Sequence, residues 1–304
     1  MTGGLALDAV LALAVVGVAL AALRLRDAFG AVVAFIAFGL LLALVWVRIG
    51  APDVALTEAA IGGGVTGVML IGAATRLRAE AAPPGLGLRL AAGVLCATIT
   101  AGLAAAVLLL PEPGPSLAVE AAAHLPGLGL GNPVTGVLLA YRAIDTFMEA
   151  VVLVVALIAI WSLAPDDAWG GRPGAVARQD GALGLLAGVL PPIGLLLGVH
   201  LFWVGAEAPG GAFQGGTILA AMWILAWMAG RVEPPRADSS TTRWLIVLGP
   251  VLFLAVGLLG FVVADGFLAY PAGWAKPLIL GIEAALTLSI AAALALMVAG
   301  WPAR

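Results

Sequence analysis

The chain has 304 residues, of which 63% are hydrophobic and only 10% are Asp, Glu, Lys or Arg. Soluble domains carry about 25% charged residues, so this composition excludes an ordinary soluble protein and predicts a protein that crosses the bilayer several times. The net charge of −3 and the scattered basic residues exclude a nucleic-acid partner. Cys96 is the only cysteine, and His124 and His200 lie far apart. No zinc or iron–sulfur site can be built from them, so we expect no metal, no cofactor and no enzymatic centre in this chain.

Apolar stretches of the right length dominate the sequence. A transmembrane helix needs about 20 residues, and nine stretches come near this length: 5–23, 29–49, 54–75, 88–110, 134–163, 183–204, 213–230, 244–264 and 276–298. We therefore predict an all-α, polytopic integral membrane protein with about nine transmembrane helices. The loop between the fourth and fifth spans is expected to hold a short surface helix around 116–124.

The basic residues predict the orientation of the spans. Eleven of them fall on one side of the membrane: Arg24, Arg26, Arg76, Arg78, Arg89, Arg172, Arg178, Arg231, Arg236, Arg243 and Arg304. Only Arg48 and Lys276 fall on the opposite side, and Arg142 falls within a span. Because basic loops stay in the cytoplasm, we expect the N-terminus outside, the C-terminus in the cytoplasm, and a location in the cell inner (plasma) membrane.

The fifth span, NPVTGVLLAYRAIDTFMEAVVLVVALIAIWS, carries Arg142, Asp145 and Glu149 in its middle. Spacings of three and four place them on one helix face. Asp145 is expected about 18 Å from the start of this helix, near the centre of a hydrocarbon layer about 30 Å thick. A charge at that depth costs about 2.5–3.5 kcal/mol unless it pairs or faces water.

Two interpretations of these charges remain open. The three groups could form an ion-pair cluster that only locks helices together. Alternatively, one arginine meets two carboxylates, so one carboxylate is left over to take a proton or meet a moving cation. We favour the second interpretation.

The third span reads PDVALTEAAIGGGVTGVMLIGAATRL. Asp53 stands at its outer start, where the helix dipole favours a negative charge, and we interpret it as a helix-start residue. Glu58 lies deeper and is a candidate for ion translocation. Gly62, Gly63 and Gly64 are interpreted as close-packing residues, with a π-bulge or a gating twist as the alternative.

The loop from Gly205 to Gly216 joins the sixth and seventh spans at the predicted outer face. It is no nucleotide loop, because no strand precedes it and no Lys-Ser or Lys-Thr follows its glycines. Gly210, Gly211 and Gly215 are expected to form a turn or to allow close packing or gating. Glu207, just before the next helix, is a secondary candidate.

Three further polar residues stand in the last module. His200 is interpreted as a hydrogen-bonded interior histidine, with a proton relay as the alternative. Lys276 opens the ninth span and is another secondary candidate. Glu283 lies two turns deeper and is a candidate intramembrane carboxylate.

These residues carry a family resemblance. NPVTGVLLAYRAIDTFMEA resembles the two-helix module, and PDVALTEAAIGGGVTG the three-helix module, that Mrp-type multisubunit cation/proton antiporters share with membrane-bound hydrogenases. GAEAPGGAFQGG resembles the signature of the B-type subunit of the same antiporters, although Ala206, Glu207 and Ala208 replace the family's polar residues and Ala212 replaces a usual glycine. The first five helices also resemble the J-type subunit of respiratory complex I.

Two polar linkers rich in proline and glycine, 79–87 and 164–181, divide the chain into three modules, at 1–80, 88–163 and 180–304. The resemblance implies an ion-translocating membrane subunit of a Na⁺/H⁺ antiporter. In this subunit we expect Glu58, Asp145, Glu149 and Glu283 to line an ion path and Arg142 to set their protonation. Its implied partners are Na⁺, H⁺, the lipid bilayer and other membrane subunits, including antiporter-like ones supplied by another chain. Two alternatives stay open: a subunit of a redox-driven relative of complex I, such as a membrane-bound hydrogenase, and a purely structural scaffold.

Overall fold

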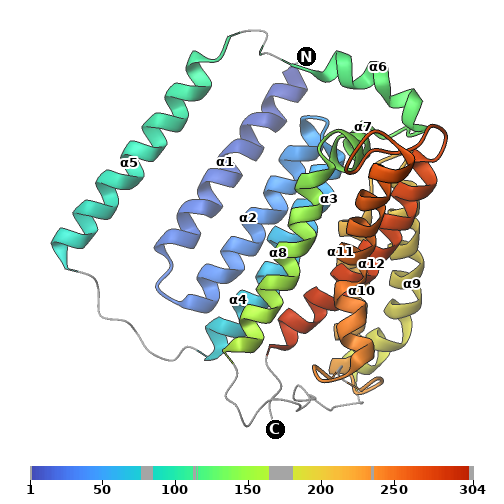
Figure 1. Cartoon of the computed structure of the whole chain (residues 1–304). Helices are drawn as coiled ribbons and strands as arrows, with labels where there is room; N and C mark the ends of the chain where they lie inside the picture. Colours follow the sequence, from blue (N-terminus) through green and yellow to red (C-terminus); the bar gives the residue numbers. More distant parts are fainter. Residues whose placement is uncertain are drawn as a thin grey trace.

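The protein is described by a computed structural model that covers residues 2–76, 85–111, 114, 116–163, 181–233 and 236–300. Within these ranges every regular element is a helix (Figure 1). In chain order these are α1 (Thr2–Arg24), α2 (Ala28–Arg48), α3 (Pro52–Glu58), η1 (Ala59–Val65), α4 (Thr66–Arg76), α5 (Leu86–Leu109), α6 (Ala118–Leu128), α7 (Pro133–Gly136), η2 (Val137–Tyr141), α8 (Ala143–Ser162), α9 (Ala182–Val204), α10 (Ala212–Met228), α11 (Ser240–Val263) and α12 (Ala275–Ala299), where η marks a π-helix.

The predicted membrane spans are present as helices. In the part of the chain that the structure describes, eight segments are long and apolar enough to cross a membrane. The remaining predicted span is α10, whose 17 residues extend about 26 Å, slightly less than a bilayer core. The prediction of an all-α, multi-pass membrane protein is confirmed. The expected surface helix is α6. Most of both polar linkers, 79–87 and 164–181, lies outside the described residues.

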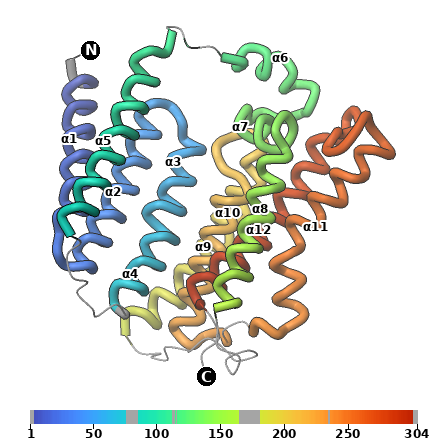
Figure 2. Tube along the Cα trace, turned by 60° about the vertical axis from the view of Figure 1, so that its left-hand side comes forward, coloured from blue at the N-terminus to red at the C-terminus, as the bar shows by residue number. Residues whose placement is uncertain are grey.

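Helix α12 forms the centre of the C-terminal half. It packs against α8, α10 and α11, and Ile279 and Ile282 on it are fully buried. Phe147 of α8 and Phe253 of α11 meet edge to face beside it, with ring centroids 5.7 Å apart. In contrast, α5 has no buried residue and stands apart from the other helices in Figure 1. Figure 2 shows it on the same side of the molecule as α1 and α2. The solid core therefore lies around α12, and the N-terminal half is a looser layer of helices.

The third span contains a π-helix, η1, where the three consecutive glycines occur. The span also packs closely on α2, because a Cβ on Gly39 of α2 would lie 3.0 Å from backbone atoms of Gly62 and Gly63. A Cβ on Gly67 would meet Ile36 of α2 at 2.6 Å. The glycines thus serve close packing, and the π-distortion accompanies it. A gating movement of η1 remains a prediction.

The fifth span differs from the expected continuous helix. Asn132 begins the segment by capping Val134 through its side-chain oxygen, and α7 and η2 follow. At Arg142 the backbone leaves helical geometry, with φ −129° and ψ 38°, and α8 starts at Ala143. The expectation of one straight helix through Arg142, Asp145 and Glu149 is therefore wrong.

Side-chain hydroxyls satisfy carbonyls next to this break. Thr146 Oγ1 donates to the Leu138 carbonyl at 2.7 Å, and Tyr270 Oη donates to the Leu139 carbonyl at 2.7 Å. Burial raises the pKa of the Tyr270 phenol, so it remains a hydrogen-bond donor at neutral pH. Backbone groups in a bilayer must find partners within the protein. Thr146, eight residues after Leu138, and Tyr270, in the α11–α12 loop, therefore supply the hydrogen-bond donors that the carbonyls at the break need.

The two basic residues on the predicted outer side are both paired with carboxylates. Arg48 Nε lies 2.7 Å from Asp8 Oδ1, linking the ends of α1 and α2. Lys276 at the start of α12 pairs with Glu207 of the loop before α10. Exposed pairs of this kind contribute about 0–1 kcal/mol each. They mainly define how neighbouring helix ends are joined.

The packing of η1 gives the first prediction. Gly63→Leu is expected to lower the thermal stability of the detergent-solubilised complex, because a Cβ at Gly63 already lies 2.9 Å from Leu40 and overpacking costs about 1–3 kcal/mol. Gly72→Leu is the control, since a Cβ on Gly72 of the same span meets nothing within 4 Å. If Gly63→Leu instead slows ion exchange in vesicles without loss of stability, the glycines serve a movement rather than packing.

Candidate functional site

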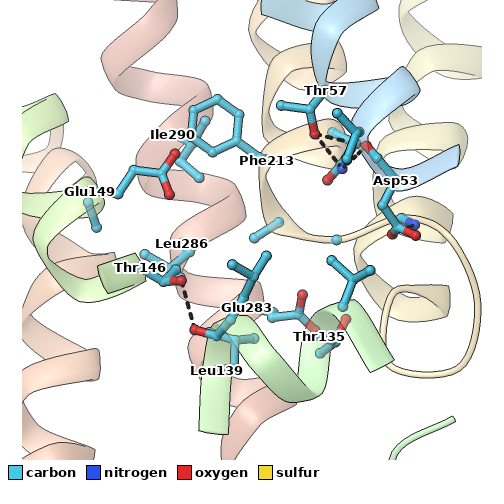
Figure 3. A pocket seen from close by; sticks show the side chains of 18 of the residues that line it. Asp53, Thr57, Thr135, Leu139, Thr146, Glu149, Phe213, Glu283, Leu286 and Ile290 are labelled. Carbon is cyan, nitrogen blue, oxygen red and sulfur yellow. Dashed lines mark hydrogen bonds between the residues drawn. The ribbon is translucent and has the colours of Figure 1, made fainter. Parts of the chain in front are cut away.

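A cavity of about 230 Å³ lies where all three predicted modules meet. Its walls come from α3 of the first module, from α7, η2 and α8 of the second, and from α10 and α12 of the third (Figure 3). The volume is large enough for several water molecules or a partly hydrated ion. Carboxylates of all three modules share this cavity.

Three acidic side chains line the cavity: Asp53, Glu149 and Glu283. No Lys, Arg or His is among the described residues that line it. The other polar lining side chains are neutral: Thr57, Thr135, Thr146 and Gln214. A concave surface lined by one sign of charge, with apolar walls of low dielectric, concentrates ions of the opposite sign. The cavity is therefore suited to protons and cations.

Asp53 forms a buried hydrogen-bond junction between three helix starts. Its side chain is on α3, and Oδ1 accepts from Asn132 Nδ2 at 3.2 Å and from the Gly210 backbone N–H at 3.1 Å. Asn132 Nδ2 also lies 3.0 Å from the Gly205 carbonyl oxygen and 3.1 Å from that of Ala208. Asp53 is only 7% exposed, so these contacts hold α3, α7 and the loop before α10 together.

Gln214 extends the same junction into the cavity. Its Nε2 donates to Thr57 Oγ1 at 2.9 Å and to the Asp53 backbone oxygen at 3.3 Å. Thr57 Oγ1 in turn donates to the Asp53 carbonyl at 3.0 Å. The first turns of α3 and α10 are thus tied to each other by side chains as well as by Asp53.

Glu149 and Glu283 occupy different environments in this cavity. Glu283 of α12 is only 3% exposed, and its Oε2 is buried without a hydrogen-bond partner among the described residues. Glu149 of α8 is exposed in the isolated chain and lies near Ile290 on the opposite side from Asp53 (Figure 3). The cavity therefore runs from an open side at Glu149 to a closed end at Glu283.

Arg142 pairs with Asp145 rather than with a cavity residue. Arg142 Nε lies 2.7 Å from Asp145 Oδ2, and both side chains are well exposed, at 71% and 49%. Neither residue lines the cavity. Because the helix breaks at Arg142, this ion pair joins the residue before α8 to the first turn of α8. Glu149 lies about one turn further along α8 and has no arginine partner among the described ion pairs.

Glu58 lies on the other side of the third span, against α2. Its Oε1 is 3.4 Å from the position that a Cβ would take on Gly39, and it packs over Gly62 of its own helix. Glu58 is half-buried and does not line the cavity. The structure therefore separates Glu58 from the two carboxylates of α8 and α12.

The remaining predicted residues lie on α9, in the loop before α10, and on α10 and α12. His200 is exposed on α9 in the isolated chain, so the expectation of an interior histidine is wrong here. Glu207 and Lys276 form an ion pair. Gly210 and Gly211 line the cavity, and Gly215 packs so closely that a Cβ would meet the Gly198 carbonyl oxygen of α9 at 2.6 Å. The loop glycines thus allow backbones to approach, and two of them also form the cavity wall.

Sequence reasoning missed four members of the hydrogen-bonded junction: Asp53 as more than a helix-start residue, and Asn132, Thr57 and Gln214 altogether. Asp53 does stand in the first turn of α3, but its carboxylate is used by two other segments. All four lie within the quoted sequence motifs, in otherwise apolar spans. The sequence did show polar residues at the starts of apolar spans. The residues that they bond in the other modules, however, lie 73 to 161 positions away along the chain.

Two family models match this chain. Residues 13–79 match MbhD, which is described as the D component of MBH, and residues 182–301 match MnhB, described as a "domain related to MnhB subunit of Na+/H+ antiporter". The chain therefore contains a segment similar to MbhD followed by a segment similar to the MnhB-related domain. The predicted resemblance to these two modules is confirmed. The exact module boundaries, including those of the two-helix module at 88–163, remain predictions.

Two proteins similar to this chain extend the comparison. The uncharacterized protein MJ1307 of Methanocaldococcus jannaschii is 28% identical over an alignment that covers 46% of this chain and 64% of that protein. A chain in the structure of the Mrp complex from Dietzia sp. DQ12-45-1b has a TM-score of 0.75 and 24% identity, and the match covers 97% of this chain and 35% of that chain. The fold of nearly the whole chain is therefore found within a much longer chain of a multisubunit complex.

The Asp53 junction gives the second prediction. If Asp53 only complemented the helix dipole, its loss would cost about 0.3–1 kcal/mol and glutamate would replace it. Because its loss instead leaves the buried Gly210 N–H without its acceptor, at about 1–3 kcal/mol, Asp53→Leu and Asp53→Glu are both expected to lower the melting temperature of the solubilised complex. Asp265→Leu, at an exposed position, is the control. A stable Asp53→Glu variant would contradict the junction.

Proposed function

We propose that this chain is an ion-translocating membrane subunit of an Mrp-type Na⁺/H⁺ antiporter. The cavity between the modules would hold a proton or a cation in transit, with Glu149 and Glu283 as the groups that take it up. The chain carries out transport rather than catalysis, needs no cofactor of its own, and works in the cell inner (plasma) membrane with its N-terminus outside and its C-terminus in the cytoplasm.

One observation carries this proposal: carboxylates from α8 and α12 line a single cavity with no basic residue among its described lining. Ionisable residues inside membrane spans are expensive and usually mark ion pathways. In contrast, Asp145 is paired locally with Arg142 at the start of α8. Glu283 is buried and has an oxygen without a partner among the described residues, which a purely structural residue would not need. Glu58 remains a candidate for a separate section of the path.

The names of the matched proteins agree with this function. One matched model is named for a subunit of a Na⁺/H⁺ antiporter, and the similar solved structure is an Mrp complex. The partners would be other membrane subunits, including antiporter-like ones. The exposed apolar surface of α5 and of α1 would be covered by such subunits or by lipid, because apolar surface of this extent is not stable in water.

A second candidate function is favoured by the match of residues 13–79 to MbhD, a component of MBH. In that case the same cavity would serve a redox-driven complex related to membrane-bound hydrogenases, with cofactors on other chains. Purification of the intact complex distinguishes the two. Subunits that carry iron–sulfur clusters indicate redox coupling, and a complex without them indicates an antiporter.

The third prediction concerns the two cavity carboxylates. Glu149→Gln and Glu283→Gln are each expected to lower Na⁺-dependent proton exchange by about tenfold or more in everted vesicles, because a neutral amide cannot take up a proton near neutral pH and supplies no negative charge to balance a cation. The amount of assembled complex should stay near that of the parent protein.

Glu120→Gln is the matched control, since Glu120 lies on the exposed surface helix α6 and not in the cavity. It should exchange ions at the parent rate. Loss of assembly in the two cavity variants, with normal exchange by whatever complex forms, would favour the scaffold alternative instead.

A further inference from the structure

At the closed end of the cavity, two acceptor oxygens face the same small space. The position that a Cβ would take on Gly211 lies 3.2 Å from Gln214 Oε1 and 3.4 Å from Glu283 Oε1. Gly211 has a φ of +131°, which any other residue would adopt only with strain. The glycine therefore keeps a space open beside an amide oxygen and a carboxylate.

The orientation of the Gln214 amide is set by its other end. Nε2 donates to Thr57 Oγ1 and to the Asp53 backbone oxygen. A backbone carbonyl can only accept a hydrogen bond, so turning the amide over would bring two acceptors together. The Gln214 oxygen, which also can only accept, is thereby directed to Gly211 and the cavity.

The Glu283 carboxylate completes this arrangement. It is 3% exposed, and its Oε2 has no hydrogen-bond partner in the described part of the chain. Ala212, the first residue of α10, lines the same cavity as the carboxylate, and the N-terminus of a helix favours negative charge. An ionised Glu283 is thus supported on one side, but no basic side chain of the described lining offsets its charge. The Gln214 amide oxygen and the Glu283 carboxylate therefore face a space in which a cation or a proton could bind.

We propose that the closed end of the cavity binds one monovalent cation, partly stripped of water, between the Glu283 carboxylate and the Gln214 amide oxygen, and that a proton on Glu283 displaces it. This inference rests on the proposed function and assigns its ion site. One carboxylate and one neutral amide supply a single negative charge, which matches a monovalent rather than a divalent ion. Oxygen ligands of this type suit hard cations such as Na⁺.

The two occupants exclude each other. When Glu283 is protonated, its hydroxyl can donate to the Gln214 oxygen, and no charge is left to hold a cation. When Glu283 releases that proton towards the cavity, the carboxylate and the amide oxygen can both contact the cation. Competition for one carboxylate is a sufficient basis for exchanging a cation for a proton.

The test is the Na⁺ dependence of exchange by the assembled complex in everted vesicles. Gln214→Leu removes the amide oxygen but retains Glu283, so the Na⁺ concentration for half-maximal exchange is expected to rise about tenfold, equivalent to about 1.4 kcal/mol of binding. Thr217→Val is the matched control, one turn along α10 and also buried, because its hydroxyl bonds the Phe213 carbonyl of its own helix. It should leave the Na⁺ dependence unchanged.

Direct binding of radioactive Na⁺ to the purified complex gives a second readout. Binding is expected to fall as the pH is lowered, and to fall at every pH in Gln214→Leu and Glu283→Gln. If Gln214→Leu does not assemble, Gln214→Asn decides the question in both measurements, since it keeps an amide but withdraws the oxygen by one carbon–carbon bond. It should shift the Na⁺ dependence in the same direction.

The outcomes separate this inference from the proposed function. If Glu283→Gln abolishes exchange while the Gln214 variants keep the parent Na⁺ dependence and Na⁺ binding, the cavity carries protons only and the cation site is overturned. If Glu149→Gln and Glu283→Gln both exchange ions at the parent rate, the proposed function of the cavity fails. A raised Na⁺ requirement in the Gln214 variants, with Thr217→Val unchanged, supports the site.

Discussion

The hydrogen bonds that meet at the Asp53 carboxylate are the interaction on which the rest of the site depends. They join the start of α3 to Asn132 before α7 and to Gly210 before α10. Each of these helix starts belongs to a different predicted module, and each has backbone N–H groups without partners inside its own helix. A single buried acceptor therefore aligns three modules at one level. Without that alignment Gln214 could not reach Thr57, and the closed end of the cavity would lose its shape.

The same requirement, that polar groups within a bilayer be satisfied by the protein, explains the irregular helices beside the cavity. The π-helix η2 and the break at Arg142 would leave carbonyls exposed to lipid. Thr146 and Tyr270 cover two of them, and Tyr270 comes from the loop between α11 and α12. The second module is thus irregular where the third module supplies a donor. This coupling places Glu149 on a helix, α8, whose start is set by contacts with the C-terminal half.

Hydrophobicity and charge distribution in the sequence were enough to predict the helices and their approximate bounds, and three sequence motifs carried the family resemblance. They were also enough to single out Glu149 and Glu283, because an acidic residue in an apolar span is expensive wherever it occurs. They could not predict the break at Arg142, since its supporting hydroxyl on Tyr270 lies 131 positions from Leu139. For the same reason Asp53 looked like a helix-start residue. Local sequence shows that a polar group is present, whereas only the fold shows which distant group it meets.

The acidic residues near the membrane core therefore fall into two groups according to their partners. Asp53 accepts two hydrogen bonds, and Asp145 holds a guanidinium. These contacts fix geometry, and both hydrogen bonds to Asp53 end on Oδ1. Glu283 is buried as deeply as Asp53 but keeps an oxygen that no described residue partners. An unsatisfied buried carboxylate destabilises the empty state, and binding a proton or a cation removes that penalty. The free-energy penalty of the unpaired Glu283 carboxylate in the empty cavity is thus the source of the cavity's affinity for a proton or a cation.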